Sequence, residues 1–153
     1  WIVDEVEVVD DPEAALERLA NPSFNPARTV LLERQPAPAL ETNSEPIGTC
    51  TVSRRNDGGL DITTDTQRDG YLVLSEVFYP GWKMTLDGEP VDTQRADYLI
   101  TAVPLPAGQH RLTYSYHPRS FRIGLLATAL TCVAGIALLV NTWRHRIRIH
   151  SRN

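Results

Sequence analysis

An uncharged run near the C-terminus constrains this chain more than any other feature. Residues 123–140 contain no charged side chain, and they are followed by Trp143 and a basic tail. As a helix extended to Trp143, the run would rise about 31 Å, which matches the hydrocarbon thickness of a bilayer. A buried core helix is the alternative, but such a helix is seldom apolar on all faces over this length. The sequence therefore predicts a transmembrane helix over residues 119–143, with the lipid bilayer as its partner and Trp143 at the interface.

Charge divides the chain at the same place. All nineteen acidic residues precede Tyr98. Residues 1–118 carry nine Lys and Arg against these nineteen acids, a net charge of −10, whereas residues 119–153 carry six Arg and no acid, a net charge of +6. Because an acidic domain is repelled by phosphate, this composition argues against nucleic acid as a partner.

The arginines predict the orientation of the helix. Arg119 and Arg122 precede the uncharged run, whereas four arginines follow it: Arg144, Arg146, Arg148 and Arg152. The positive-inside rule then makes residues 144–153 a basic cytoplasmic tail and places residues 1–118 outside the membrane. A tail-anchored protein with the reverse topology is the alternative. Because the chain starts at Trp1 without a signal peptide, we expect it to be the end of a longer protein with earlier transmembrane helices.

Residues 1–118 predict a mainly β domain with one short N-terminal helix. Residues 1–9 alternate apolar and acidic side chains, as a half-buried strand does. Asp11 and Pro12 are typical of a helix start, and Asn21-Pro22 ends that helix. Residues 35–46 contain three prolines and no periodicity, which predicts an exposed linker or long loop.

Turn signals follow about every 8–12 residues, as in a sandwich or barrel. We expect hairpin turns at 56–59 and at Asp87-Gly88. The sequence predicts a jelly-roll-like antiparallel β-sandwich whose strands cover residues 47–55, 60–66, 71–77, 82–86, 98–103 and 111–116. The alternation predicts that six side chains face inward: Trp82, Met84, Leu86, Leu112, Tyr114 and Tyr116.

The search for catalytic chemistry gives no candidate. No nucleophile elbow, phosphate-binding loop, dinucleotide fingerprint or paired-cysteine metal site is present. His110 and His117 would fall on opposite faces of one strand. Four aspartates repeat every four residues (Asp57, Asp61, Asp65 and Asp69), a spacing that could suggest calcium. No glycine-centred twelve-residue loop accompanies them, and in a strand Asp61 and Asp65 are better explained as solvent-facing carboxylates. We therefore predict no catalytic residue, no metal and no cofactor.

The richest segment is the aromatic stretch around Pro80-Gly81. Phe78, Tyr79 and Trp82 are candidate contacts for a ligand or for the membrane interface, because aromatic rings beside a turn form sugar-stacking platforms or lipid-facing wedges. For Trp82 the alternation with Met84 and Leu86 favours a place in the core instead.

Several of these segments together resemble the C-terminal region of the YfhO family of large bacterial multi-pass membrane proteins. The resemblance lies in residues 70–82, 87–88, 95–98, 103–110, 116–118 and 120–124, and in the earlier stretches 11–16, 24–26 and 29–33. It covers most of the chain and is specific in order and spacing.

The family in turn resembles C-type glycosyltransferases, which add sugars from a polyprenyl-phosphate donor to cell-envelope polymers. The resemblance implies that the catalytic acids lie among early transmembrane helices that this chain lacks, so no catalytic residue is carried over. It implies an extracytoplasmic accessory domain followed by the last transmembrane helix in the bacterial cell membrane, with upstream helices and envelope glycan as partners. A structural or carbohydrate-binding domain without catalysis and a free-standing single-pass enzyme are the competing classes.

Overall fold

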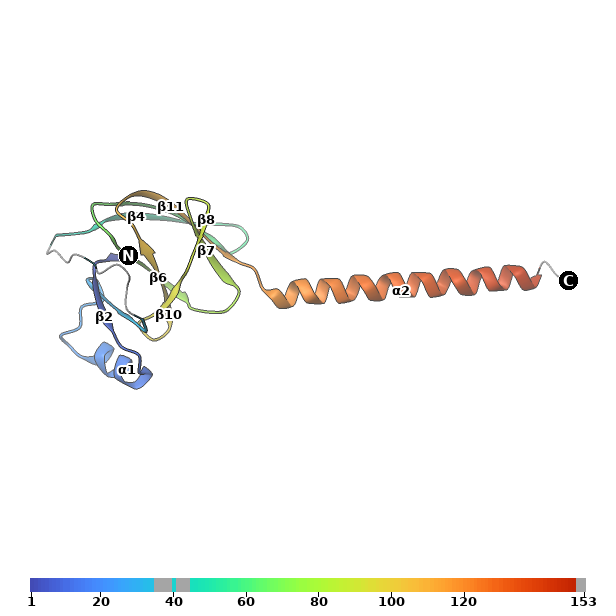
Figure 1. Ribbon diagram of the computed structural model, residues 1–153, viewed down its shortest axis with the longest axis horizontal. Helices are drawn as coiled ribbons and strands as arrows, with labels where there is room; N and C mark the ends of the chain where they lie inside the picture. Colours follow the sequence, from blue (N-terminus) through green and yellow to red (C-terminus); the bar gives the residue numbers. More distant parts are fainter. Residues whose placement is uncertain (35–39, 41–44, 151–153) are drawn as a thin grey trace. The chain divides into compact units, whose positions relative to one another are not determined.

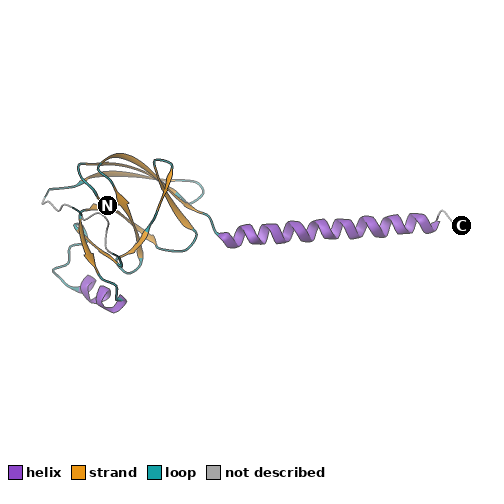
Figure 2. Ribbon diagram, viewed as in Figure 1, coloured by secondary structure: helices purple, strands orange, loops and turns teal. Residues whose placement is uncertain are grey.

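The chain forms two compact units in the computed structural model, Trp1–His117 and Pro118–Asn153. The structure describes residues 1–34, 40 and 45–150; within the C-terminal helix it describes the side chains of residues 120, 121 and 123–138. The first unit is built mainly of strands, and the second is a single helix (Figure 2).

The described residues contain eleven strands and two helices, which are drawn in Figure 1. In chain order these are β1 (Ile2–Val3), β2 (Glu5–Val8), α1 (Pro12–Ala20), β3 (Thr29–Leu32), β4 (Gly48–Arg54), β5 (Leu60–Thr66), β6 (Gly70–Val77), β7 (Trp82–Leu86), β8 (Glu89–Val91), β9 (Gln94–Ala96), β10 (Ile100–Leu105), β11 (Gly108–Tyr116) and α2 (Arg119–His150).

The strands form two sheets with a shared apolar core. The six-stranded sheet has the order β1-β6-β10-β9-β3-β2, and the five-stranded sheet has the order β4-β5-β11-β7-β8. The core between them takes buried side chains from both sheets, among them Leu72 and Val103 from one and Ile62 and Leu112 from the other. The prediction of a mainly β, antiparallel domain is therefore confirmed, whereas its jelly-roll-like winding stays a prediction.

One strand pair departs from the antiparallel pattern. β2 and β3 pair in parallel, and a parallel pair needs a crossover connection. Helix α1 supplies it, and Figure 1 shows α1 beside β2. The Asp11 side chain caps this helix by accepting from Ala14 N at 2.9 Å, so the predicted N-cap and the proline at its first turn are confirmed.

The hairpin signals are confirmed after residue 46. β4 and β5 pair from Gly48↔Thr66 to Arg54↔Leu60 across the turn at 56–59, and β7 and β8 pair across Asp87-Gly88. β6 is a central strand that pairs with β1 and β10, and its first five residues are buried. Of the loop predicted over residues 35–46, residues 35–39 and 41–44 lie outside the described residues.

The inward-facing side chains agree with the prediction in part. Met84, Leu112 and Tyr114 are buried, and Trp82 and Leu86 are half-buried against the same core. The prediction for Tyr116 is wrong, because its side chain is 44% exposed. β11 pairs with β5 only as far as Tyr114 and with β7 as far as Tyr116, so Tyr116 lies at the end of the sheet with a strand neighbour on one side.

The six-stranded sheet curls around a second core. Its two outermost strands, β1 and β2, are separated in sequence by the single residue Asp4. Two residues of chain span at most about 7 Å, so the first and last strands of the sheet must approach each other at Asp4. The second core lies on the face of β6 opposite to the first: Tyr71 and Val73 point into it, whereas Leu72 and Leu74 point into the first.

Helix α2 is a single 32-residue helix. The large apolar side chains described between residues 121 and 138 are exposed, from Phe121 (68%) to Leu138 (66%). Thr128 donates to Gly124 O at 2.9 Å and Thr131 donates to Ala127 O, so both threonines bond to their own helix backbone. Within the described part of the chain, no helix has the length and hydropathy that crossing a membrane requires. The transmembrane assignment of residues 119–143 stays a prediction.

Candidate functional site

The loop between β6 and β7 carries the aromatic residues that the sequence singles out. Phe78 N donates to Leu99 O at 2.8 Å, and His117 N donates to Gly81 O at 2.6 Å. The loop is thus held between the start of β10 and the end of β11. Gly81 has a φ of 106°, a conformation open mainly to glycine, so the turn itself requires glycine at this position.

Trp82 connects this loop to the core. Its ring stacks on Tyr114 with centroids 4.5 Å apart and planes 13° apart, and it lies 5.2 Å from the tilted ring of Tyr116. Tyr114 is buried and Tyr116 is exposed. The half-buried Trp82 ring therefore contacts both the buried Tyr114 ring and the exposed Tyr116 ring.

Phe78 is covered on one face. The Arg95 guanidinium lies over its ring, 5.7 Å from the centroid, in a cation–π arrangement. Arg95 also pairs with Glu33, with Nη1 and Oε1 3.3 Å apart. Of the three candidate contacts, Tyr79 has the most exposed side chain, at 60%.

These residues belong to a larger exposed surface, which we call the aromatic surface. It consists of Val77, Phe78, Tyr79, Tyr98, Leu99 and Tyr116. Five of its members are among the nine large hydrophobic side chains that are exposed in the described part of residues 1–117. The sequence pattern singled out Phe78 and Tyr79 but missed Val77, Tyr98, Leu99 and Tyr116. Alternation within a strand predicts the face on which a side chain lies, but it does not predict where the opposing sheet ends and the side chain becomes exposed.

An unusual turn holds Tyr98 and Leu99 in place. Asp97 and Tyr98 both have positive φ, 45° and 71°, which is uncommon for residues other than glycine. The Asp97 carboxylate accepts from Leu31 N at 2.9 Å, and Asp97 N donates to Leu31 O at 2.9 Å. Burial raises the pKa of Asp97 above its ordinary value. The turn is thereby fastened to β3.

A histidine–aspartate pair lies at the end of the sandwich opposite to the aromatic surface, where β11 begins. His110 Nδ1 is 2.7 Å from Asp87 Oδ2, and Arg111 N donates to Asp87 Oδ1 at 2.8 Å. The bond with Asp87 raises the pKa of His110, and the bond from Arg111 N, followed by that of His110, lowers the pKa of Asp87. The pair joins the β7–β8 turn to β11, with Asp87 in a positive φ of 52°.

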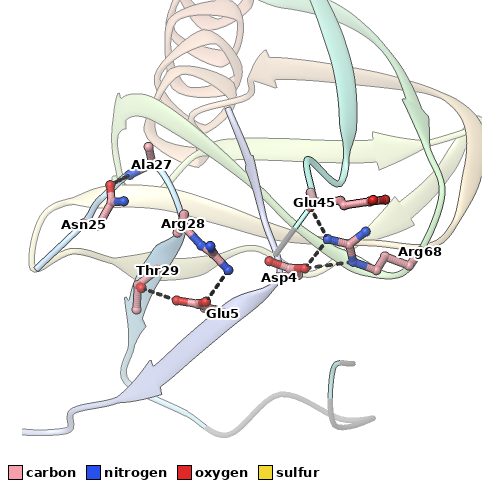
Figure 3. Close-up of polar contacts among 8 residues, drawn as sticks. All are labelled: Asp4, Glu5, Asn25, Ala27, Arg28, Thr29, Glu45 and Arg68. Atoms are coloured by element: carbon pink, nitrogen blue, oxygen red, sulfur yellow. Dashed lines mark hydrogen bonds and ion pairs between the residues drawn. The ribbon is translucent and has the colours of Figure 1, made fainter. Parts of the chain in front are cut away.

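An ion-pair network surrounds the junction of β1 and β2 (Figure 3). Arg68 donates to Asp4 Oδ2 at 2.8 Å from Nε and 2.6 Å from Nη2, and to Glu45 O at 2.6 Å. Next to it, Glu5 accepts from Arg28 and from Thr29, each at 2.8 Å. Both arginines are bonded to carboxylates. We call the ion pair of Arg68 with Asp4 the clamp at the β1–β2 junction.

The four regularly spaced aspartates each accept a hydrogen bond from a different residue, and Arg55 forms ion pairs with two of them, Asp57 and Asp61. Asp57 accepts from Gly59 N, and this bond lowers the pKa of Asp57. Asp61 accepts from Thr113, Asp65 accepts from Gln109, and Asp69 accepts from Ala107 N. Across the described residues, no group of three or more His, Cys, Asp or Glu side chains is placed to hold a metal ion.

An apolar cavity of about 230 Å³ lies at the end opposite to the aromatic surface, beside Gly70 and Leu105. Asp69 is the one carboxylate among its described lining residues, and it is already bonded to Ala107 N at 2.8 Å. The cavity lacks the converging polar groups typical of a ligand site.

The comparison with protein families identifies the chain. The sequence pattern described as "Bacterial membrane protein YfhO" matches residues 40–128, more than half of the chain. The chain belongs to the YfhO family. The YfhO match includes β4 to β11, and with them the aromatic surface, and it extends into α2; the resembling stretches within residues 11–33 lie before it. No curated protein and no solved structure matches this YfhO chain.

Proposed function

We propose that this chain is the extracytoplasmic accessory domain and last transmembrane helix of a membrane protein that transfers sugars to cell-envelope polymers. The observation that carries the proposal is membership of a bacterial membrane protein family. The resemblance of that family to polyprenyl-phosphate-dependent transferases supports the sugar chemistry. Further membrane helices of the same protein and envelope glycan are the proposed partners.

Three features support α2 as the membrane anchor. The helix is continuous over 32 residues, residues 123–140 carry no charge, and the apolar side chains described on it are exposed rather than packed. A helix that is apolar all round requires an apolar environment. The arginine excess after residue 143 supports a cytoplasmic tail and an extracytoplasmic sandwich.

The polar groups of the sandwich support a non-catalytic role for this part. The described carboxylates closest to a base, such as Asp87 beside His110, hold turns together rather than converge on a cavity. A transferase base must lie within hydrogen-bond reach of the acceptor hydroxyl. We therefore place catalysis outside this chain and assign the domain to covering or shaping the acceptor side.

A second candidate function is carbohydrate binding or a purely structural role. The exposed ring of Tyr79 favours carbohydrate binding, since a free aromatic face stacks on sugars. In a panel of envelope glycans, binding that disappears in Tyr79→Ala but persists in Trp1→Ala, a second exposed aromatic, would support that function. Absence of binding across the panel would favour the structural role.

A topology reporter tests the main proposal. A reporter that is active only in the cytoplasm, fused after Asn153 in the bacterial membrane protein, is expected to be active, and the same reporter inserted in the exposed Asn56–Gly58 turn is expected to be inactive. Activity of a periplasm-dependent reporter at Asn153 would reverse the orientation. Release of the fusion from membranes by carbonate would contradict the transmembrane assignment.

A further inference from the structure

We infer that the aromatic surface rests in the interfacial layer of the outer leaflet, with its tyrosines at the level of the lipid headgroups. The inference rests on the proposed function, because it requires α2 in the bilayer and the sandwich outside. It names the partner of the aromatic surface as a lipid surface rather than a glycan.

The first argument is the position of the surface along the chain. The loop before Trp82 is bonded to His117, the last residue of the first unit, through Gly81 O at 2.6 Å. Helix α2 begins two residues later at Arg119, and two residues span at most about 7 Å. The aromatic surface therefore lies where the chain leaves the sandwich for the proposed membrane helix.

The second argument is chemical composition. The surface presents tyrosine rings together with Val77 and Leu99, all between 44% and 60% exposed. Tyrosine and tryptophan concentrate at membrane interfaces because one end of the ring system is apolar and the other is polar. An apolar patch gathered at one place on an otherwise polar surface indicates a contact site.

The third argument is charge. Residues 1–118 carry a net charge of −10, which disfavours approach to an anionic membrane. At the end that bears the aromatic surface, however, Glu76 pairs with Arg54 at 3.2 Å and Asp57 pairs with Arg55 at 3.0 Å, while Asp97 is turned inward to Leu31. Acidic side chains remain at this end, because Tyr98 lies beside Asp10, Asp11 and Glu33, so the charge favours contact with zwitterionic rather than anionic headgroups.

Three further acids lie at the other end. Asp69, Asp87 and Glu89 belong to the turns where β6 and β11 begin and β7 ends, as the register Gly108↔Thr66 and Leu86↔Glu89 requires. An orientation that places the aromatic surface on the membrane therefore turns these carboxylates toward water and away from lipid phosphate.

Two of the rings offer at most one face to a sugar. One face of Phe78 is covered by Arg95 and one face of Trp82 by Tyr114, which leaves the exposed tyrosines as the main contact groups of the surface. An interfacial contact needs only exposed edges and hydroxyl groups, which the tyrosines provide. Glycan binding at this surface is the competing outcome of the test.

Depth measurements by spin labelling test the inference on the full chain in vesicles of zwitterionic and anionic lipid. In a background with Cys50→Ser and Cys132→Ser, single nitroxide labels are placed by Tyr79→Cys, Tyr98→Cys, Glu89→Cys and Leu130→Cys. Oxygen, which partitions into lipid, and a water-soluble nickel chelate report depth. We expect the Leu130 label to be deepest, the Tyr79 and Tyr98 labels to be at the headgroups, and the Glu89 label to be in water.

The outcomes separate the inference from the proposed function. Chelate accessibility of the Leu130 label equal to that of Glu89 would overturn the transmembrane helix itself. A buried Leu130 label together with Tyr79 and Tyr98 labels as accessible to the chelate as Glu89 would overturn the inference alone. Loss of Tyr79 label mobility on adding envelope glycan, without any lipid contact, would overturn it in favour of a glycan platform. Native-like far-ultraviolet circular dichroism of each variant controls for misfolding.

Discussion

At the scale of single residues, β11 shows how one alternating strand serves two environments. Leu112 and Tyr114 are enclosed by both sheets, whereas Tyr116, on the same face, is exposed. β5 pairs with β11 only up to Tyr114, whereas Tyr116 still pairs with Trp82 of β7, so Tyr116 lies at the end of the sheet with a strand neighbour on one side. A residue's place in the alternation decides its face, and its position along the strand decides its burial.

Leu112→Ala should lower the free energy of unfolding by roughly 2–5 kcal/mol, because Leu112 is fully buried in the first core and its truncation leaves a cavity. Val52→Ala is the matched control: Val52 is 50% exposed on β4, and its truncation should change stability by less than about 0.5 kcal/mol. Urea unfolding of both variants measures the difference. Equal effects would contradict the assignment of Leu112 to the core.

The His110–Asp87 pair predicts a pH dependence of stability. Because Asp87 raises the pKa of His110 in the folded state, the stabilisation is fully present below the unfolded pKa of about 6.5 and is lost as pH rises through the folded pKa. We expect the difference in unfolding free energy between wild type and His110→Gln to be largest near pH 6 and to shrink toward pH 8.

The control for that measurement is the Asp87→Asn background, which removes the carboxylate bonded to His110. In that background the effect of His110→Gln should lose its decrease between pH 6 and pH 8. A His110→Gln difference that grows with pH would contradict the sign. The lowered pKa of Asp87 adds a separate loss of stability at acid pH, as that carboxylate becomes protonated.

At the scale of elements, turns and the helix start could be predicted from local sequence, whereas contacts between segments far apart in the sequence could not. The turns at 56–59 and at Asp87-Gly88 specify their hairpins through residues that tolerate positive φ, and Asp11-Pro12 specifies the start of α1. The parallel pairing of β2 with β3 was not predicted. β2 alternates valine with glutamate, whereas β3 is a four-residue run whose last three residues are buried, and neither short strand specifies its partner. The aromatic surface was predictable only at its loop, since Tyr98 and Leu99 reach it through a turn with two unusual backbone conformations.

The clamp at the β1–β2 junction predicts a large element-scale effect. Asp4 is 6% exposed, and Arg68→Met would leave its carboxylate without the bidentate guanidinium, so we expect a loss of about 3 kcal/mol in unfolding free energy. Arg54→Met is the matched control, because the Arg54 side chain is 69% exposed and its pair with Glu76 should contribute less than about 1 kcal/mol. Thermal unfolding at neutral pH distinguishes the two; similar losses would contradict the clamp.

At the scale of the whole molecule, the division of labour predicts that the chain alone catalyses no sugar transfer. Intramembrane active sites ordinarily carry an Asp, Glu, His, Lys or Arg, and residues 123–143 contain none of these. On the proposed function, the purified chain in vesicles should give no turnover with lipid-linked sugars, and deleting this segment from the proposed longer protein should impair acceptor binding or stability. Transfer by the purified chain, measured with a radiolabelled donor, would move the catalytic residues into the sandwich.

The junction at Asp4 also bears on how the domain avoids aggregation. The outer strand of a sheet normally presents unpaired backbone groups that can recruit a strand of another molecule. In the six-stranded sheet the outer strands β1 and β2 are only two and four residues long and are joined through Asp4, so each offers a short edge. In the five-stranded sheet, β8 is three residues long and contains Pro90, which has no N–H to offer. Among the described strands this leaves β4, seven residues long, as the edge at which a strand of another molecule finds the longest template.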